Sequence, residues 1–350
     1  MFNLESITRE NIKALQSYKV WRDDYLDNSK AIFLDNCENN LGSPIGLGYE
    51  RYPSSSQTKV KQAIADYKKI DVNNLVIGNG SDELIDLLIR CFCEPKHDNM
   101  VICEPTFGMF KIYAQLNDIE VLNAPLKKEI FSFDEQLILR TTNLRTKLIF
   151  ICSPNNPTGT SISLDQIKTI ADNFSGIVVI DEAYIDYSEK ASATSLLNDY
   201  PNIIVIQTFS KAWGLAALRI GVGYSQPNII AILNKVRPPF NISGNTQSVL
   251  IKALEKAPKK DELVAVNLKQ KKALEKELQQ LPFVKKIITS DANYFLIEVI
   301  DAEKICAYLL EYTILVSNRS SLLNCENHIR ISIGTETENK QLMNILRTMP

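Results

Sequence analysis

Short apolar segments alternate with helical patterns through the middle of the chain. Six are strand-sized and apolar on both faces: residues 75–77, 100–103, 147–152, 177–180, 203–207 and 219–223. After the first of them, the spacing in residues 82–93 predicts a helix. Its apolar face carries Leu84, Leu87, Leu88 and Cys91. Apolar strands that alternate with helices indicate a mostly parallel sheet covered by helices on both sides.

The pattern changes after residue 240. Helical segments at 246–255, 260–280 and 302–311 are mixed with short strands at 287–289, 294–299, 329–333 and near residue 314. This mixture predicts a smaller α+β unit. We therefore expect an N-terminal arm with part of the small domain at 1–45, a large domain at 46–243 and a small C-terminal domain at 244–350.

Composition narrows the class of protein. The 350 residues carry 39 Lys and Arg against 41 Asp and Glu, a net charge of -2, which argues against a nucleic-acid binder. No apolar run reaches the ~20 residues of a membrane span, and residues 1–10 lack the pattern of a signal peptide. Seven scattered cysteines favour a reducing cytoplasm over a disulfide framework. We therefore expect a cytoplasmic protein that binds neither nucleic acid nor membrane.

Histidine and cysteine are too sparse for several common kinds of site. The only two histidines, His97 and His328, disfavour a Ser-His-Asp triad and a multi-histidine metal site. Cys91 and Cys93 have no second Cys or His pair at ligand spacing, so we interpret them as buried thiols. We expect no metal site.

Polar residues follow the predicted strands at their carboxyl ends, where open α/β sheets bind ligands. The turn at residues 78–83 is rich in glycine and opens a helix, whose free N–H groups attract anions such as phosphate. Ser81 is either a helix cap or a phosphate ligand. Residues 153–159 form a loop made rigid by two prolines, which presents Asn156; the alternative is a structural turn.

Asp181, Lys211 and Arg219 adjoin three further strands. A carboxylate at the end of a buried strand is costly unless paired, and a pyridinium N–H would pair with Asp181; a helix cap is the alternative. Lys211 lies between an apolar strand and the apolar stretch 212–218, where burial would lower its pKa and make it a nucleophile. Most lysines, however, are solvated surface charges. Arg219 needs an anionic partner, which a phosphate would supply.

The order of these motifs resembles that of the fold-type I aminotransferases, which use pyridoxal 5′-phosphate (PLP), and within them the histidinol-phosphate aminotransferase family. The resemblance covers nearly the whole chain. Segments shared with the wider group are Asn155-Asn156-Pro157-Thr158-Gly159, Asp181-Glu182-Ala183-Tyr184 and Ser210-Lys211. The narrower family is indicated by Arg51-Tyr52-Pro53, Gly80-Ser81-Asp82-Glu83, Pro105-Thr106-Phe107-Gly108-Met109 and Arg237-Pro238-Pro239-Phe240-Asn241. The resemblance implies a large PLP-binding domain with a mostly parallel seven-stranded sheet flanked by helices, plus a small α+β domain.

The resemblance also implies roles for the matching residues. Lys211 would hold PLP covalently and, once released, move a proton, while Asp181 would pair with the pyridine nitrogen. Asn156 and Tyr184 would hydrogen-bond the 3′ oxygen of the cofactor, and Tyr184 joins Lys211 and Asp181 as a catalytic residue. The other implied cofactor contacts are a ring stacked by Phe107, and a phosphate bound by Ser81, Asp82, Ser210, Arg219 and, across a homodimer interface, Tyr52.

The residues implied for substrate binding include one departure from the family. Arg330 would clamp the α-carboxylate with its planar fork, and Tyr18 would cover the substrate. Many members have an arginine for the substrate's phosphate at the position of Ser317. Arg319 lies two residues on and faces the same side if the strand continues. We therefore expect Arg319, helped by Arg22, to take that task.

The favoured reaction is amino transfer between L-histidinol phosphate and 2-oxoglutarate, which gives imidazole-acetol phosphate and L-glutamate in histidine biosynthesis. Tyr184 and the Arg237–Phe240 segment favour it over threonine-phosphate decarboxylase. Ser317 keeps an aromatic or broad-specificity aminotransferase open. A PLP-binding regulator or inactive paralogue is a further alternative, although no appended helix-turn-helix domain is visible. Nucleotide binding through residues 78–81 would explain none of the later motifs.

Overall fold

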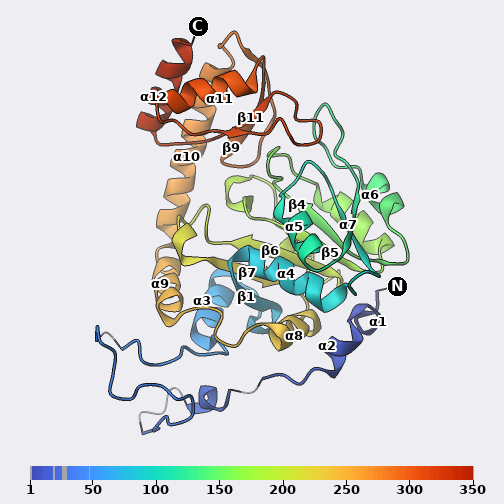
Figure 1. Ribbon diagram of the computed structural model, residues 1–350, viewed down its shortest axis with the longest axis vertical. Helices are drawn as coiled ribbons and strands as arrows, with labels where there is room; N and C mark the ends of the chain where they lie inside the picture. The colour runs from blue at the N-terminus through green and yellow to red at the C-terminus, as the bar shows by residue number, and fades with distance from the viewer. Residues whose placement is uncertain (1, 19, 26–29, 47, 350) are drawn as a thin grey trace.

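The computed structural model describes residues 2–18, 20–25, 30–46 and 48–349 (Figure 1). Its larger part is built on a seven-stranded sheet and its smaller part on a four-stranded sheet. The long helix α10 (Ala257–Leu278) runs from the larger part up to the smaller one, which holds the C-terminus. The expected fold class, a large mostly parallel sheet with helices and a small α+β unit, is confirmed.

The large sheet has the strand order β1-β7-β6-β5-β4-β2-β3. Neighbouring strands are parallel except along β7 (Ile220–Tyr224), which runs antiparallel to both β1 and β6. The other strands are β1 (Leu75–Asn79), β2 (Asn99–Ile102), β3 (Glu120–Asn123), β4 (Thr146–Cys152), β5 (Ile177–Asp181) and β6 (Ile203–Thr208).

Helices cover both faces of this sheet, so most residues of its strands other than β3 are buried and apolar. On one face the core includes α1 (Leu4–Ile7), α4 (Gly80–Phe92), α5 (Met109–Leu116) and α8 (Pro227–Val236). On the other it includes α3 (Thr58–Lys68), α6 (Glu135–Thr141), α7 (Leu164–Asn173) and α9 (Gly244–Leu254). Helix α2 (Glu10–Ala14) follows α1.

The small sheet is antiparallel, with the order β10-β11-β9-β8. Its strands are β8 (Val284–Ile287), β9 (Tyr294–Val299), β10 (Ser317–Asn318) and β11 (His328–Ser332). The core of this part lies between the sheet and three helices, α10, α11 (Ala302–Glu311) and α12 (Glu336–Arg347). Short 3₁₀ helices occur at Trp21–Tyr25, Val72–Asn74, Ile185–Tyr187, Ala193–Leu196 and Ala216–Leu218.

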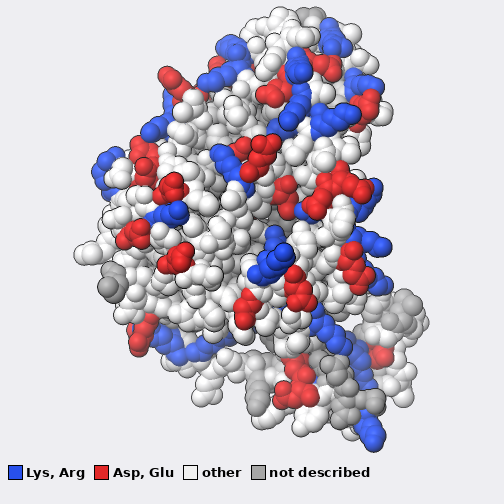
Figure 2. Space-filling view, turned by 180° about the vertical axis from the view of Figure 1, so that it is seen from behind, with Lys and Arg blue, Asp and Glu red and all other residues white. Residues whose placement is uncertain are grey.

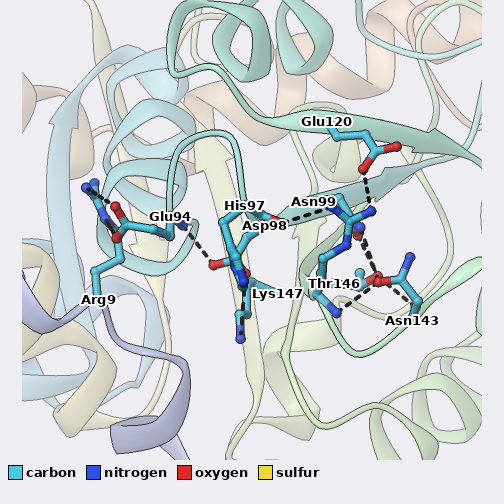
Figure 3. A network of polar contacts seen from close by, with 10 residues as sticks. Arg9, Glu94, His97, Asp98, Asn99, Glu120, Asn143, Thr146 and Lys147 are labelled. Atoms are coloured by element: carbon cyan, nitrogen blue, oxygen red, sulfur yellow. Dashed lines mark hydrogen bonds and ion pairs between the residues drawn. The ribbon is translucent and has the colours of Figure 1, made fainter.

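Polar contacts close the edge of the large sheet where β2 and β4 begin (Figure 3). Thr146 Oγ1 donates to Asn99 Oδ1 at 2.6 Å, and Asn99 Nδ2 donates to Asn143 Oδ1 at 3.2 Å. Nearby, an ion pair of 2.9 Å between Arg9 and Glu94 ties the N-terminal helices to the end of α4. These contacts pair polar side chains at the amino ends of the strands with one another.

The described N-terminal helices contact the larger part of the molecule. Ile7 packs in the core beneath α4 and α8, and Lys235 Nζ donates to the carbonyl oxygen of Lys13 at 2.8 Å. Leu250 of α9 also packs in a core of the large sheet. The boundaries expected at 45/46 and 243/244 stay a prediction.

The surface charges and the helices match the balanced charge and the short apolar runs of the sequence. Lys and Arg are interspersed with Asp and Glu over the face shown in Figure 2, rather than gathered by sign. Within the described ranges, no helix has both the length and the apolar character that crossing a membrane requires.

Candidate active site

A cavity of about 470 Å³ opens at the carboxyl edge of the large sheet. Its walls come from the segments that follow β1, β2, β4, β5 and β6, from the residue before β7, and from the small sheet. These elements bring together most of the residues singled out in the sequence, namely Ser81, Asp82, Phe107, Asn156, Asp181, Tyr184, Ser210, Lys211, Arg219, Arg319 and Arg330.

Asp181 is a buried carboxylate at the end of β5. Its side chain accepts a hydrogen bond of 3.1 Å from the backbone N–H of Ala183. The loss of hydration on burial raises its pKa to about 7, and the charge of Lys211 opposes that shift only weakly. A cationic N–H donor in the cavity would favour the ionised carboxylate, so Asp181 suits a protonated ring nitrogen.

Lys211 follows β6 and faces the ring of Tyr184, with Nζ 5.6 Å from the ring centroid. The sequence predicted a buried lysine, but the residue is exposed at the cavity. The reason is that the apolar stretch after it forms a turn and a short surface helix, Ala216–Leu218, rather than a core strand. Partial desolvation of the ammonium, and then the charge of Arg330, still lower the pKa of Lys211. A larger fraction of amine is therefore available than on an ordinary surface lysine.

Tyr184 is buried against the small sheet. Its ring meets that of Tyr294 edge to face, with centroids 5.0 Å apart. Burial raises the pKa of the Tyr184 phenol, so the hydroxyl stays protonated and can donate a hydrogen bond. This property suits a partner that carries negative charge on oxygen.

The start of helix α4 forms an anion cradle with Arg219. Within the described chain, the side chain of the N-cap residue Asn79 makes no capping hydrogen bond, and the N–H of Gly80 donates to the carbonyl oxygen of Arg219 at 2.9 Å. The next N–H groups of the first turn, those of Ser81 and Asp82, are therefore the ones open to an anion. Arg219 lies across them, paired with Asp82 at 3.2 Å and hydrogen-bonded to Ser210 at 3.5 Å. Gly80 has φ +78, a backbone conformation that favours glycine, and a Cβ there would displace the Arg219 guanidinium, whose Nη2 would lie 2.7 Å away.

Two arginines reach the cavity from the small sheet. Arg330 Nη1 donates to Asn156 Oδ1 at 2.5 Å, which connects β11 to the loop after β4. Arg319 follows β10, and burial, then the charge of Arg330, lower its pKa. The Nε atoms of Arg319 and Arg330 are both buried without a hydrogen-bond partner among the described residues. Two guanidinium groups so placed predict an anionic ligand.

Three further residues of this site, Tyr294, Cys152 and Thr208, were not singled out in the sequence. Tyr294 Oη donates to the carbonyl oxygen of Asn155 at 2.6 Å, so the small sheet holds the loop that carries Asn156. Cys152 lines the cavity next to Asp181, with which it is paired in the sheet. Thr208 lines it as well, and its Oγ1 accepts from the backbone N–H of Ser210 at 3.1 Å. The signal for Cys152 and Thr208 was their place as last residues of a strand.

Three other residues lie away from the cavity. Tyr52 stacks on Phe240 with ring centroids 4.7 Å apart, and Tyr18 is 72% exposed. Arg22 does not help Arg319, because it binds two carboxylates of the N-terminal segment, Asp35 at 2.5 Å and Glu38 at 2.6 Å. That expectation is corrected, since a guanidinium already held by two acids has no free charge for a substrate.

The residues at the cavity are suited to PLP. The buried Asp181 forms no ion pair with a cation of the described residues, the start of α4 with Arg219 provides a phosphate cradle, and Lys211 provides the amine. These three features surround one cavity at the carboxyl edge of a doubly covered, mostly parallel sheet. This combination defines the class of the PLP-dependent enzymes of fold type I.

Comparison with known sequences gives the same class. The family "Aminotransferase class I and II" matches residues 45–346. A histidinol-phosphate aminotransferase of Cytophaga hutchinsonii is 45% identical over 347 residues, which cover 99% of either chain. One of Flavobacterium psychrophilum is 42% identical over 349 residues, again 99% of either chain. The chain belongs to the class I and II aminotransferases and, within them, to the histidinol-phosphate aminotransferase family.

Solved structures share the fold. The histidinol-phosphate aminotransferase of Clostridium acetobutylicum has a TM-score of 0.79 at 22% identity and covers 85% of this chain and 90% of its own. That of Sinorhizobium meliloti, determined in complex with pyridoxal-5′-phosphate, has a TM-score of 0.79 at 22% identity, with 86% and 84% covered. An L-threonine-O-3-phosphate decarboxylase of Porphyromonas gingivalis has a TM-score of 0.73 at 18% identity, with 86% and 93% covered. The fold alone therefore does not separate these reactions.

Proposed function

We propose that the chain transfers the amino group of L-histidinol phosphate to 2-oxoglutarate, giving imidazole-acetol phosphate and L-glutamate. Its membership of the histidinol-phosphate aminotransferase family supports this reaction. The observation that carries it in the cavity is the pair of guanidinium groups with unpartnered Nε atoms, Arg319 and Arg330. An amino donor that carries a phosphate supplies the anion that these groups require.

The residues around the cofactor have different roles, which depend on the part of PLP that each would contact. Bound PLP supplies an electron sink that stabilises negative charge on the substrate's α carbon. Lys211 Nζ holds the cofactor covalently and, when free, carries a proton to and from that carbon. Asp181 would keep the pyridine nitrogen protonated. Asn156 and the Tyr184 hydroxyl would hydrogen-bond the 3′ oxygen, and Phe107 would pack on the ring.

The phosphate of the cofactor would lie at the start of α4. There the backbone N–H groups of Ser81 and Asp82 would donate to the anion, and Ser210 and Arg219 would add a hydroxyl and a guanidinium. Tyr52 would complete this cradle in the partner subunit of a homodimer.

The two arginines of the small sheet would distinguish the two substrates. L-Histidinol phosphate carries a phosphate ester in place of the α-carboxylate of an amino acid. Arg330 would bind the α-carboxylate of glutamate and 2-oxoglutarate, and would share the phosphate of histidinol phosphate with Arg319. Ser317 pairs with Arg330 in the small sheet but lines a neighbouring groove and not the cavity, so it would leave this task to Arg319. Tyr18 would cover the substrate.

We also propose a homodimer in the cytoplasm. The described residues 30–46 contain apolar side chains that no core covers, for example Ile32 at 84%, Leu34 at 78% and Leu41 at 98% exposed. An extended arm with this composition is stable when a second copy buries it. Tyr52, half exposed beyond this arm, would then reach the partner's cradle.

The spectrum of the purified chain tests the proposed reaction. Histidinol phosphate should remove the visible absorbance of the lysine-bound cofactor, and 2-oxoglutarate should restore it. Release of carbon dioxide from threonine phosphate would instead support a decarboxylase. Removal of the band by phenylalanine but not by histidinol phosphate would support an aromatic aminotransferase.

A further inference from the structure

Three segments that mark the narrower family in the sequence meet at one place in the fold. They are the strap (residues 51–57, before α3), the turn (residues 78–83, which opens α4) and the linker (residues 237–241, between α8 and α9). The proposed phosphate cradle gives the turn a role, and the proposed dimer gives the strap a role. Neither gives a role to the linker, which does not line the cavity.

Asn241 in the linker is bonded to the turn. Its Nδ2 donates to Glu83 Oε2 at 2.7 Å and to the carbonyl oxygen of Ile77 at 3.0 Å. Its own carbonyl oxygen accepts from Asn79 Nδ2 at 3.1 Å. Glu83 Oε2 also accepts from the backbone N–H of Asn79 at 2.5 Å. One carboxylate oxygen thus connects Asn241 to the backbone just before the N–H groups of the cradle.

The same amide is bonded to the strap. Asn241 Oδ1 accepts from Arg237 Nη1 at 2.6 Å and from Gln57 Nε2 at 2.7 Å. Arg237 Nη2 donates in addition to the carbonyl oxygen of Ser55 at 2.9 Å. Gln57 is fully buried and Arg237 is only 8% exposed, so water does not replace these contacts readily.

The linker also holds Tyr52 through a second contact. Phe240, the neighbour of Asn241, stacks on the Tyr52 ring at an interplanar angle of 23°. Both ends of the strap are therefore attached to the linker, and the linker is attached to the turn.

We propose that Asn241 is a positioning residue that couples the strap to the turn and thereby sets the affinity of the cradle for the phosphate of PLP. The role rests on the proposed cofactor site. Asn241 touches no cofactor itself. It holds Glu83 and Asn79 so that the first N–H groups of α4 keep their direction, and it joins them to the segment that carries Tyr52.

Asn241→Asp cuts this connection at one end. The carboxylate still accepts from Arg237, but it faces Glu83 as a like charge where the amide donated a hydrogen bond. We expect the affinity of the full-length, cofactor-free chain for PLP to fall by at least about ten-fold. The affinity for pyridoxal, which lacks the phosphate, should not change. Both constants are measured by titrating the visible absorbance of the lysine-bound ring.

Two further variants keep the test decisive. Asn241→Ala removes the amide without adding a charge and should give the same selective loss for PLP. Asn117→Ala is the matched control, because Asn117 Nδ2 donates to Asp86 on the same helix α4 at 2.8 Å, away from the turn. It should leave both affinities unchanged. Thermal unfolding of each variant without cofactor establishes that it is folded.

The outcomes separate this role from the cofactor site itself. If the Asn241 variants weaken PLP and pyridoxal equally, or weaken neither, the positioning role is overturned. If the unaltered chain binds PLP no better than pyridoxal, the proposed cradle is wrong instead.

Discussion

At the scale of single residues, the chemistry depends on a few charges that the fold leaves without partners. Asp181 is buried among groups that do not neutralise it, and the Nε atoms of Arg319 and Arg330 have no hydrogen-bond partner in the described part of the chain. Such groups destabilise a protein unless a ligand satisfies them. The site is therefore built for a molecule with a protonated ring nitrogen and for substrates with anions.

The pH dependence of stability tests the environment of Asp181. Its pKa of about 7 in the folded, cofactor-free chain exceeds the ~3.9 of an unfolded chain. The folded chain therefore keeps a proton that the unfolded chain loses, and this contribution to stability is lost as pH rises from about 4 to about 7. The asparagine of the Asp181→Asn variant does not ionise, so the variant does not lose stability in this way.

The variant should therefore gain stability relative to the unaltered chain as pH rises through that range, by at most about 4 kcal/mol. Urea unfolding of both cofactor-free proteins at several pH values measures the difference. A difference that stays constant with pH would contradict the assignment. With PLP bound, the unaltered chain should instead be the more stable of the two, because Asp181 then pairs with the ring nitrogen.

The arginine pair predicts a difference between substrates. Arg319→Ala should raise the KM for histidinol phosphate about ten-fold or more and change that for glutamate much less, whereas Arg330→Ala should raise both. Arg347→Ala is the control, since this arginine of the small domain forms an exposed ion pair with Glu277 and does not line the cavity. Steady-state kinetics with each substrate provide the measurement. An unchanged KM for histidinol phosphate in Arg319→Ala would show that this residue does not bind it.

At the scale of elements, the residues of the cavity are positioned mostly by the ends of strands and the starts of helices. Gly221 in β7 lies against the first turn of α4, where an added Cβ would be 2.3 Å from the backbone nitrogen of Ser81. The cradle therefore depends on a close approach of two backbones that only glycine permits.

Gly221→Ala should push α4 away from β7. We expect a loss of about 1–3 kcal/mol in unfolding free energy, together with weaker PLP binding. Gly244→Ala in α9 is the control, because its added Cβ would meet only Pro53 at 3.7 Å. Thermal unfolding and PLP titration of both variants measure the effects. If both variants unfold and bind PLP alike, β7 and α4 have room for an added Cβ, and the close contact is not required.

The elements also show how far the sequence predicts this site. Buried strands such as β4 and β5 were predicted because both faces are apolar, and their last residues pointed to Asp181 and Asn156. Strand β3 was not predicted, because this short edge strand is only partly buried and lacks an apolar run. Strand β10 was expected near residue 314 but begins at Ser317, since its pairing with β11 decides its place.

Contacts between the two sheets were beyond sequence reasoning. Tyr294 begins an apolar strand, and nothing in that pattern shows that its hydroxyl bonds the loop after β4. Arg22 was expected near the substrate, but local pairing with Asp35 and Glu38 decides its position. Side chains whose partners lie far along the chain are set by tertiary packing, which a single sequence does not reveal.

At the scale of the whole molecule, the N-terminal arm predicts the oligomeric state. Replacing Leu34 and Leu41 with Glu places charges where a partner should bury apolar surface, so the dimer should dissociate and PLP affinity should fall. Leu144→Glu is the control, because Leu144 is 99% exposed on the loop before β4. Sedimentation at several protein concentrations measures the state. A monomeric unaltered chain with full activity would contradict the homodimer.

The central claim concerns the amine of Lys211. The chain loaded with PLP is reduced with borohydride, digested, and searched by mass spectrometry for the peptide that carries the cofactor. We predict a single modified residue, Lys211, and no labelling in Lys211→Ala. Cofactor fixed to another lysine, or equal labelling of the Lys211→Ala variant, would contradict the account.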